Sequence, residues 1–397
     1  MSIGYFVPEF PSQTHAFFWR EIEAMEASGE DVVLYSTRRP AREACPHAFA
    51  EAARARTHYV FPPRRGWRLM LSRPQRLIAA IGYILGLSEA SAVEKMKLFP
   101  LIASAADLAV DCRDHGIRHV HIHSFATSAH IGALAHILDD LRYSLTLHGD
   151  LPVYGKDHAA KTARARFCAS VTAPLLEQLR EVYAGQTHLI PMGVDVGRFQ
   201  PTEKRPAPPS ALVAVTVARL TWTKGHRFFL QAMRQAIDEG VQIEYRIAGT
   251  GPYADDLKRE VSELGLEAQV TFLGQIGEDA VLEQLQHADI FALTSIGKGE
   301  AAPVSVMEAM ACGVPVICSR IGGTGDMIED GMDGFLVDQK DVEAIAAAII
   351  RLAGEPDLAP SMARAARESA VEKFSHIFRA RQLATAIQSV ARTGDIA

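Results

Sequence analysis

The sequence predicts an α/β protein made of two open parallel sheets, each covered by helices. Three observations support this fold class. Short β-rich runs alternate with helical patterns throughout the 397 residues. Several of these runs, such as LVAVTVA at 212–218, are continuously apolar, which is typical of parallel strands buried on both faces. The chain is also longer than one hydrophobic core usually fills, so two domains are expected.

The candidate strands are separated by amphipathic patterns such as FFWREIEAMEAS and HRFFLQAMRQAIDEG, which predict helices. Because such strand–helix–strand steps give parallel sheets, a ligand cleft is expected at the carboxyl ends of the strands of both domains. The predicted strands are 3–7, 31–36, 119–123, 143–147, 169–173, 212–218, 243–248, 269–273, 289–294, 315–319 and 334–337.

The division between the two domains is visible in the stretch FQPTEKRPAPPS, which holds four prolines and little to bury. We therefore expect an N-terminal domain over 1–199, a linker over 200–210 and a C-terminal domain over 211–373. The final segment, 374–397, has a helical pattern that could pack back on the N-terminal domain, which the sequence alone does not decide.

Composition excludes several classes of protein. A net charge of −6 argues against a nucleic-acid partner. Five cysteines without C-x-x-C spacing are expected to be reduced thiols of a cytoplasmic protein. Met1 runs into an apolar stretch without a basic region, so no signal peptide is expected. The longest apolar run, LIAAIGYILGL, would cover as a helix only about half of the ~30 Å hydrocarbon core of a membrane, so it is not predicted to be a membrane span.

A basic segment precedes that apolar run, in the stretch PPRRGWRLMLSRPQR. It has two readings of equal weight. One is an interfacial segment attracted to anionic lipid, which would place the protein on the inner face of the plasma membrane. The other is a solvated helix face. The basic segment consists of Arg64, Arg65, Trp67, Arg68, Arg73 and Arg76.

Two cations follow a strand in TVARLTWTKGH. The strand ends at Ala218, and the loop carries Arg219 and Lys224 before the next helix. Cations at the carboxyl end of a strand can clamp a diphosphate, although taken alone a pair of solvated charges is the commoner arrangement.

Two further strand-to-helix turns offer backbone groups. Gly249 and Gly251 in RIAGTGPYADDL permit a tight turn and the close approach of a ligand, but the stretch lacks the G-x-G-x-x-G of a dinucleotide site. An ordinary turn is therefore the simpler reading. In FLGQI, Gln275 and Ile276 could present backbone groups to the edge of a base.

Two carboxylates frame the stretch GEAAPVSVMEAMACGVPVI. Because Pro303 disfavours helix before it, Glu300 is placed in a loop, and a helix is expected to start near Ser305 with a Ser305–Glu308 capping box. A helix N-terminus attracts anions, so the amides from Val304 onward could meet a phosphate. The glutamates would then accept hydrogen bonds from hydroxyl groups, Glu308 from a ribose and Glu300 from a group beyond the phosphates.

The pattern EAAPVSVMEAMACGVPVI resembles the E-x7-E signature of family 4 glycosyltransferases, which have the GT-B fold of two Rossmann-like parallel-sheet domains facing a cleft. ARLTWTKG, IAGTGP, VTFLGQI and IPMGVDVGRFQP match in order over roughly 146–337. The resemblance implies a retaining transferase that needs no metal or other cofactor. Its donor would be a UDP- or GDP-linked sugar, and its acceptor a saccharide or polyprenyl-lipid-linked saccharide of bacterial exopolysaccharide or cell-surface glycan synthesis.

The resemblance also assigns roles. The catalytic set is His148, from SLTLHGD, together with Glu300, Arg219 and Lys224. His121 and His123 are weaker candidates. The N-terminal EFPSQTHAFFWREIEAM resembles exopolysaccharide-type members, whose first loop faces the acceptor; Ser12, Gln13, Thr14 and Asp150 are the candidates on that side. The donor-binding set is Arg219, Lys224, Gly249, Gly251, Gln275, Ile276, Glu300, Pro303, Val304, Ser305 and Glu308.

Rival functions remain at this stage. A nucleotide-sugar epimerase or a phosphorylase can share the two-domain fold, and a non-catalytic sugar-binding protein is a candidate from another class. A sugar-binding protein has no need of paired cations and carboxylates. The chain contains no D-x-D, so the expected charge stabilisation of a leaving diphosphate falls to Arg219, Lys224 and the helix N-terminus.

Overall fold

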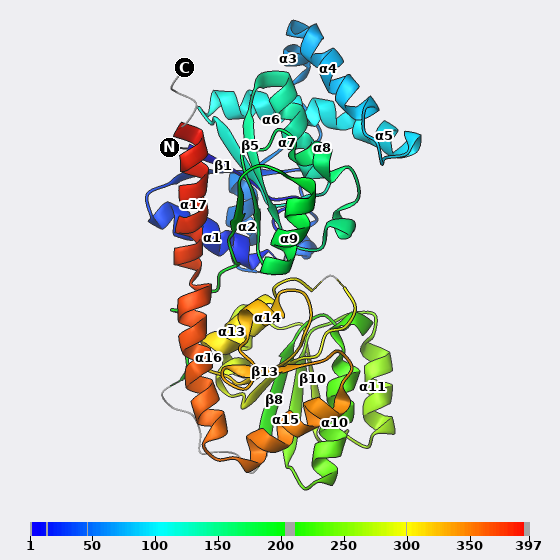
Figure 1. Cartoon of the computed structure of the whole chain (residues 1–397), viewed down its shortest axis with the longest axis vertical. Helices are drawn as coiled ribbons and strands as arrows, with labels where there is room; N and C mark the ends of the chain where they lie inside the picture. The colour runs from blue at the N-terminus through cyan, green and yellow to red at the C-terminus, as the bar shows by residue number, and fades with distance from the viewer. Residues whose placement is uncertain (1, 13–14, 46, 203–210, 299, 393–397) are drawn as a thin grey trace. The chain divides into compact units, whose positions relative to one another are not determined.

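The computed structural model describes residues 2–12, 15–45, 47–202, 211–298 and 300–392 (Figure 1). The chain divides into two compact units. The first comprises Met1–Pro191 with Ile377–Ala397, and the second comprises Met192–His376. Each unit contains one parallel sheet, so the prediction of an α/β protein with two parallel sheets is confirmed.

The first unit has a seven-stranded sheet in the order β3-β2-β1-β4-β5-β6-β7, with every neighbouring pair parallel. The order reverses between β1 and β4, which is the doubly wound arrangement. Its strands are β1 Ser2–Phe6, β2 Asp31–Ser36, β3 Thr57–Tyr59, β4 His119–Ile122, β5 Arg142–Leu147, β6 Cys168–Ser170 and β7 Thr187–Leu189.

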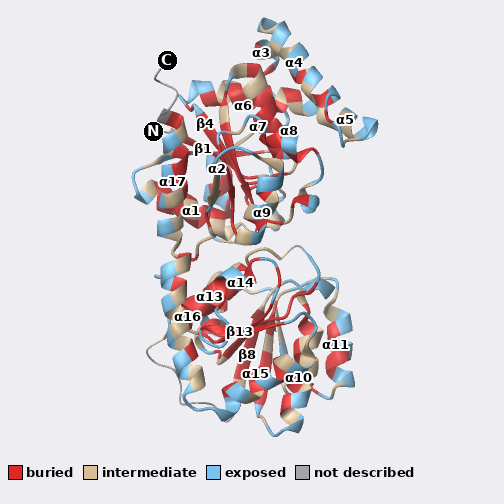
Figure 2. Ribbon diagram, viewed as in Figure 1, coloured by how far each residue is buried: buried red, intermediate tan, exposed pale blue. Residues whose placement is uncertain are grey.

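Helices cover both faces of the first sheet. The α1 helix packs with the last helix, α17, on one face, while α6 and α7 pack on the other (Figures 1 and 2). The helices are α1 Ala16–Ala27, α2 Ala50–Arg56, α3 Trp67–Ser72, α4 Pro74–Leu85, α5 Ala92–Leu98, α6 Pro100–Asp114, α7 Thr127–Asp139, α8 His158–Thr162, α9 Ala173–Val182 and α17 His376–Arg392, with short 3-10 turns η1 Arg42–Ala44 and η2 Leu151–Tyr154.

The second unit has a six-stranded parallel sheet in the order β10-β9-β8-β11-β12-β13. One core lies between this sheet and α12, α13 and α16, and another lies beneath α10, α11 and α15. The elements are β8 Leu212–Val217, η3 Trp222–Lys224, α10 His226–Asp238, β9 Ile243–Ala248, α11 Ala254–Glu263, β10 Val270–Gly274, α12 Glu278–Gln286, β11 Ile290–Leu293, α13 Val304–Ala311, β12 Val316–Ser319, α14 Thr324–Met327, β13 Gly334–Val337, α15 Val342–Gly354 and α16 Leu358–Phe374.

The eleven predicted strands all correspond to observed strands, and two short edge strands were missed. β3 has the sequence THY and β7 the sequence THL, each three residues long. Neither shows an apolar run, because each lies at an edge of the sheet and has a partner on one side only.

The boundary between the units differs from the predicted one. Residues 192–199 belong to the second unit, because the Val194 N–H donates to Phe374 O at 2.7 Å and the Arg367 guanidinium donates to Val196 O and Phe199 O. Most of the predicted linker, 203–210, lies outside the described residues.

The structure places α17 with the first unit. Ala380, Leu383, Ala384 and Ile387 are buried in the same core as strand β1, and the Arg142 side chain donates to Ala391 O at 2.9 Å. All five cysteines are buried free thiols. Among the described helices, none is both long and apolar enough to cross a membrane.

Candidate functional site

The loop after β8 carries the two predicted cations. Arg219 is exposed, and Lys224 is half-buried at the end of η3. The backbone of Arg219 is held by a histidine that the sequence analysis missed: His226 Nε2 lies 3.3 Å from Arg219 O. Burial lowers the pKa of His226 to about 4, so this ring is neutral and can donate to the carbonyl. The only sequence signal was the position of this histidine, two residues after the lysine in the stretch TKGH.

A glycine fixes the direction in which Lys224 leaves the loop. Gly225 has φ +69°, and a Cβ there would lie 1.8 Å from Thr294 O. The Thr294 hydroxyl donates to Gly225 O at 2.9 Å, and the Ile296 N–H donates to Thr223 O at 2.8 Å. The loop after β8 is therefore joined directly to the chain leaving β11.

This junction brings two predicted site residues together. Lys224 Nζ forms an ion pair with Glu300 Oε2, and the Ser295 hydroxyl donates to the same oxygen at 2.9 Å. The side chains of Lys224 and Glu300 are only 19% and 13% exposed, so this pair is screened less than a surface pair would be. Residues 76 positions apart thus form one small charged site at the carboxyl ends of β8 and β11.

The loop that carries Glu300 is also held by the turn after β12. The Gly323 N–H donates to Ala301 O at 2.7 Å. The buried Thr324 hydroxyl in turn bonds the backbone of Ser319 and Ile321, each at 2.9 Å. The GGTG turn at 322–325 therefore supports the position of Glu300.

Helix α13 follows at Val304, one residue before the predicted start, with Pro303 as its N-cap. The predicted capping box is wrong, because no side chain caps this helix and Ser305 lies inside its first turn. The first N–H groups of an α-helix have no intrahelical partner, so the helix can still receive an anion there. Glu308 is half-buried one turn further along.

The predicted glycine turn after β9 packs closely against the loop after β8. A Cβ at Gly249 would lie 1.9 Å from Ala218 O, and one at Gly251 would lie 2.2 Å from Leu220 O. These glycines therefore admit the backbone of the loop that carries Arg219. Gln275 is exposed and Ile276 half-buried after β10, where the Gly249 N–H donates to Gly274 O at 2.7 Å.

In the first unit, His148 follows β5 and lies in a chain of buried groups. His148 Nε2 is 3.1 Å from His123 Nδ1, and His123 Nε2 is 3.5 Å from Glu21 Oε1. The Tyr5 hydroxyl donates to the same Glu21 oxygen at 2.6 Å. Burial lowers the pKa of His148 to about 3, so this imidazole is neutral near pH 7. Sequence reasoning named His123 only as a weaker candidate and missed Glu21.

The other histidines of β4 have local partners. His121 bonds the hydroxyls of Ser144 and Thr146 at 2.7 and 2.8 Å, and His119 bonds Ser144 at 2.7 Å. Burial lowers the pKa of His119 to about 3 and that of His121 well below its usual value. The alternation of HVHIH thus puts neutral, hydrogen-bonded imidazoles on one face of the strand.

The acceptor-side candidates are only partly described. Asp150 accepts from the Gln178 amide at 2.8 Å, next to η2. Ser12 is half-buried, and its carbonyl accepts from the His15 N–H. Gln13 and Thr14 lie outside the described residues.

The Glu21 carboxyl gives a pH-dependent prediction. Burial raises its pKa from 4.5 to about 7. Between those pH values the folded chain keeps a proton that the unfolded chain has lost, so this group makes the folded state less stable as pH rises through that window. We expect Glu21→Gln to gain up to about 3 kcal/mol over the wild type between pH 4.5 and 8. Thermal unfolding at pH 5, 6.5 and 8 measures this; a constant difference would contradict it.

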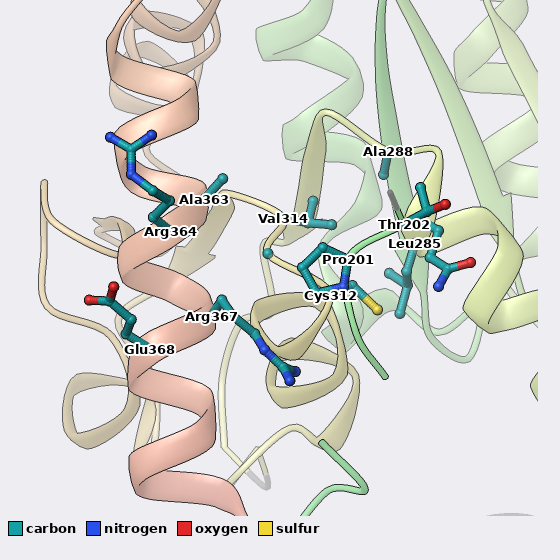
Figure 3. A pocket seen from close by; sticks show the side chains of 12 residues that line it. Pro201, Thr202, Leu285, Ala288, Cys312, Val314, Ala363, Arg364, Arg367 and Glu368 are labelled. Carbon is teal, nitrogen blue, oxygen red and sulfur yellow. The ribbon is translucent and has the colours of Figure 1, made fainter. Parts of the chain in front are cut away.

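A hollow of about 320 Å³ lies elsewhere on the second unit, lined by residues that include Pro201, Cys312 and Arg367 (Figure 3). It sits where α13 turns into β12, at the amino end of that strand, away from Lys224 and Glu300. Arg367 there donates to Ala311 O at the end of α13, at 2.7 Å, so its role is to support the helix.

The chain is similar to known glycosyltransferases. The family model described as "Glycosyl transferases group 1" matches residues 200–369. The amylovoran biosynthesis glycosyltransferase AmsK of Erwinia amylovora is 35% identical over 205 residues, which is 50% of each chain. The GDP-mannose-dependent alpha-(1-6)-phosphatidylinositol monomannoside mannosyltransferase of Mycolicibacterium smegmatis is 29% identical over 68% of this chain and 76% of its own. The chain thus spans about half the length of AmsK.

Solved structures show the same fold over the whole chain. A glycosyltransferase from Rickettsia africae ESF-5 superposes with a TM-score of 0.75 at 17% identity, covering 99% of both chains. Alr3699/HepE of Anabaena in complex with UDP superposes with a TM-score of 0.74 at 17% identity, covering 98% of this chain and all of the other. The two sheets are thus those of the GT-B fold.

Proposed function

Because residues 200–369 match the family model of the group 1 glycosyl transferases, we propose that the chain transfers a hexose from a UDP- or GDP-linked sugar to a saccharide or polyprenyl-linked acceptor. The product would be a bacterial exopolysaccharide or another cell-surface glycan. The observation that carries the proposal is the Lys224–Glu300 pair at the carboxyl ends of β8 and β11, inside the matched domain. A nucleotide-linked donor is supported by the UDP complex of the structural neighbour Alr3699/HepE. A role in exopolysaccharide synthesis is supported by the similarity to AmsK, a glycosyltransferase of amylovoran biosynthesis.

The donor would be held by its charge. Arg219 and Lys224 present cations to the diphosphate, and the N-terminus of α13 adds backbone amides. Glu308 would accept hydrogen bonds from the ribose, and Glu300 from the sugar hydroxyls. When donor binds, Lys224 would exchange its contact with Glu300 for one with phosphate. The Glu300 carboxylate, still bonded by Ser295, would then be available to the sugar.

Transfer with retention follows from front-face substitution. The bond between the anomeric carbon and the phosphate oxygen breaks, and the acceptor oxygen bonds to that carbon from the same side. The hydroxyl proton passes to the departing phosphate. Preorganised charge of this kind is worth ~3–4 kcal/mol per donor. Neutral His148, placed by His123, would hydrogen-bond to the reacting groups without adding a positive charge.

No metal takes part in these proposed steps, so added Mg²⁺ or Mn²⁺ should leave the initial rate of sugar transfer unchanged.

Transfer of radiolabelled sugar from a panel of UDP- and GDP-linked donors into a bacterial lipid extract tests the proposal. A labelled, extractable glycan with an α-linked new residue from an α-linked donor is the expected product. Conversion of the nucleotide sugar without an acceptor would favour an epimerase instead. Saturable binding with no turnover of any donor would favour a sugar-binding protein.

The α3–α5 segment, 67–98, bears on where the enzyme works. It extends to one side of the first sheet in Figure 1, and exposed residues are spread along it (Figure 2). Several of these exposed residues are large and apolar. In the structure, apolar side chains rather than arginines are the groups of this segment that are best placed to bind lipid. Three of the five arginines make ion pairs with acidic residues of α6 and α7 or just after them, which leaves the apolar side chains as the main attraction. The pairs are Arg65–Asp111, Arg65–Asp114, Arg73–Asp139 and Arg76–Asp140. The exposed side chains are Trp67, Leu71, Ile78, Leu85, Val93 and Met96.

We therefore propose that α3–α5 rests on an anionic membrane surface, and expect the protein to co-sediment with phosphatidylglycerol vesicles. Trp67→Ala with Leu71→Ala should reduce the bound fraction several-fold, because both apolar side chains lie on one face of α3. Arg73→Gln is the matched control, since its guanidinium is paired with Asp139. Equal loss in both variants would contradict the apolar contact, and so would no binding at all.

A further inference from the structure

A cluster of side chains of metal-binding types lies on the first unit, far in sequence from the donor site. His58 is on the edge strand β3, and Asp111 and His115 are one turn apart on α6 and just past its end. One ligand atom from each of the three lies within 4.8 Å of the others. In the part of the chain that the structure describes, this is the single group of three or more such residues with that spacing.

The spacing of the ligand atoms fits a small cation. Asp111 Oδ2 lies 2.9 Å from His58 Nδ1 and 3.3 Å from His115 Nδ1. A tetrahedral zinc ion with bonds of about 2.0 Å separates its ligand atoms by about 3.3 Å. The three side chains can close around one ion if His115 gives up the hydrogen bond of its Nδ1 to Asp111 O at 2.8 Å, and they leave a fourth position open.

The carboxylate between the histidines is already oriented from outside the cluster. The Tyr35 hydroxyl donates to Asp111 Oδ2 at 3.0 Å, and Arg65 donates to Asp111 Oδ1 at 3.0 Å. Arg65 also pairs with Asp114, which offsets its charge. Such outer hydrogen bonds fix the direction of a metal-binding carboxylate. Each Asp111 oxygen keeps lone-pair capacity beyond these bonds.

Access to the cluster is open. A cavity of about 360 Å³ lies beside it, lined by residues that include Tyr35, His58, Tyr59 and Asp111. The side chains of His58 and His115 are about two-fifths exposed, so an ion can enter from solvent without opening the fold. Two imidazoles and one carboxylate are donors suited to zinc and similar transition metals, and not to magnesium or calcium.

We propose that His58, Asp111 and His115 form a site for one zinc-type divalent ion, which ties the edge strand β3 to α6. Three strands, β2, β1 and β4, lie between β3 and β5 in the sheet, and β5 precedes His148, so the role is structural. The inference does not depend on the proposed glycosyl transfer, because its readout is metal binding and unfolding. The alternative is a metal-free ion pair network in which protonated histidines surround Asp111.

The test uses the full chain after treatment with a chelator and gel filtration, titrated with Zn²⁺ by calorimetry and with Co²⁺ by visible absorption. We expect one equivalent bound, the intense d–d bands of a four-coordinate Co²⁺ ion and a higher unfolding temperature with Zn²⁺. Asp111→Asn and His58→Ala should each lower the affinity at least 10-fold, and Tyr35→Phe about 10-fold.

His287→Ala is the matched control. His287 Nδ1 contacts Glu283 O at 2.7 Å in the same i, i+4 geometry as His115 with Asp111 O at 2.8 Å, but it is not part of the three-ligand cluster. This variant should bind zinc as the wild type does. Stoichiometric binding that persists in Asp111→Asn would overturn the proposal. No binding by a wild type that remains folded would also overturn it, and a pH-dependent but zinc-independent stability would favour the ion pair network.

Discussion

Replacing Lys224 with alanine is expected to lower kcat/KM for sugar transfer by about 10²- to 10³-fold, because the ammonium group stabilises the charge of the leaving diphosphate. The half-buried position of this side chain makes its charge count for more than a surface lysine would. Steady-state rates with the preferred nucleotide sugar measure the effect. Lys258→Ala, on the exposed face of α11, is the control and should retain the wild-type rate.

A lower rate in Lys224→Ala has a second possible cause, because Lys224 also forms an ion pair with Glu300 and could act only by positioning that carboxylate. If the lysine only positioned the carboxylate, Lys224→Ala would have no further effect in a Glu300→Gln background. We expect the double variant to be slower than either single variant, because the two groups contact different parts of the donor. Equal rates for Glu300→Gln and the double variant would contradict the assignment of Lys224 to the diphosphate.

Substituting Gly225 with alanine should inactivate the enzyme and lower the free energy of unfolding by more than about 2 kcal/mol. The new Cβ would lie 1.8 Å from Thr294 O at a φ of +69°, so the loop after β8 must separate from the chain leaving β11. Lys224 would move with it. Chemical denaturation and transfer assays on the same preparation measure both effects.

Two other glycines separate backbone strain from the clash. Gly240 also has positive φ, at +93°, but nothing lies within 4 Å of a Cβ there, so Gly240→Ala should cost only about 1 kcal/mol and leave transfer intact. Gly277 has φ −79° and open space, and its alanine variant should be neutral. A Gly225→Ala protein as active as Gly240→Ala would show that the junction with Thr294 does not position the lysine.

The sequence predicts those strands whose burial on both faces requires a continuous run of apolar residues. LVAVTVA and DIFALT are recognisable because central strands are apolar on both faces, whereas THY and THL at the edges carry no such pattern. The boundary near 192–199 could not be placed, because it depends on Arg367 bonding carbonyls some 170 positions earlier in the chain.

The candidate site was predicted by residue type more than by geometry. Lys224 and Glu300 were named from separate motifs, and their contact depends on the backbone junction of Gly225 with Thr294, which no local pattern encodes. The glycines at 249 and 251 were named correctly as a tight turn, but their neighbour is the backbone of 218–220. Glu21 was missed because a glutamate within a helical pattern looks like an exposed residue until its burial is known.

We propose that the carboxyl ends of β8 and β11 hold a nucleoside diphosphate through Lys224 and its sugar through Glu300. Calorimetric titration of the wild type, Lys224→Ala and Glu300→Gln with UDP, UMP, GDP and GMP tests it most directly. We expect the wild type to bind one of the diphosphates at least ~10-fold more tightly than its monophosphate, a difference of about 1.4 kcal/mol or more. Lys224→Ala should reduce that preference, leaving the part that Arg219 and the α13 N-terminus supply, and Glu300→Gln should retain it in full. An undiminished preference in Lys224→Ala would show that Lys224 does not bind the diphosphate.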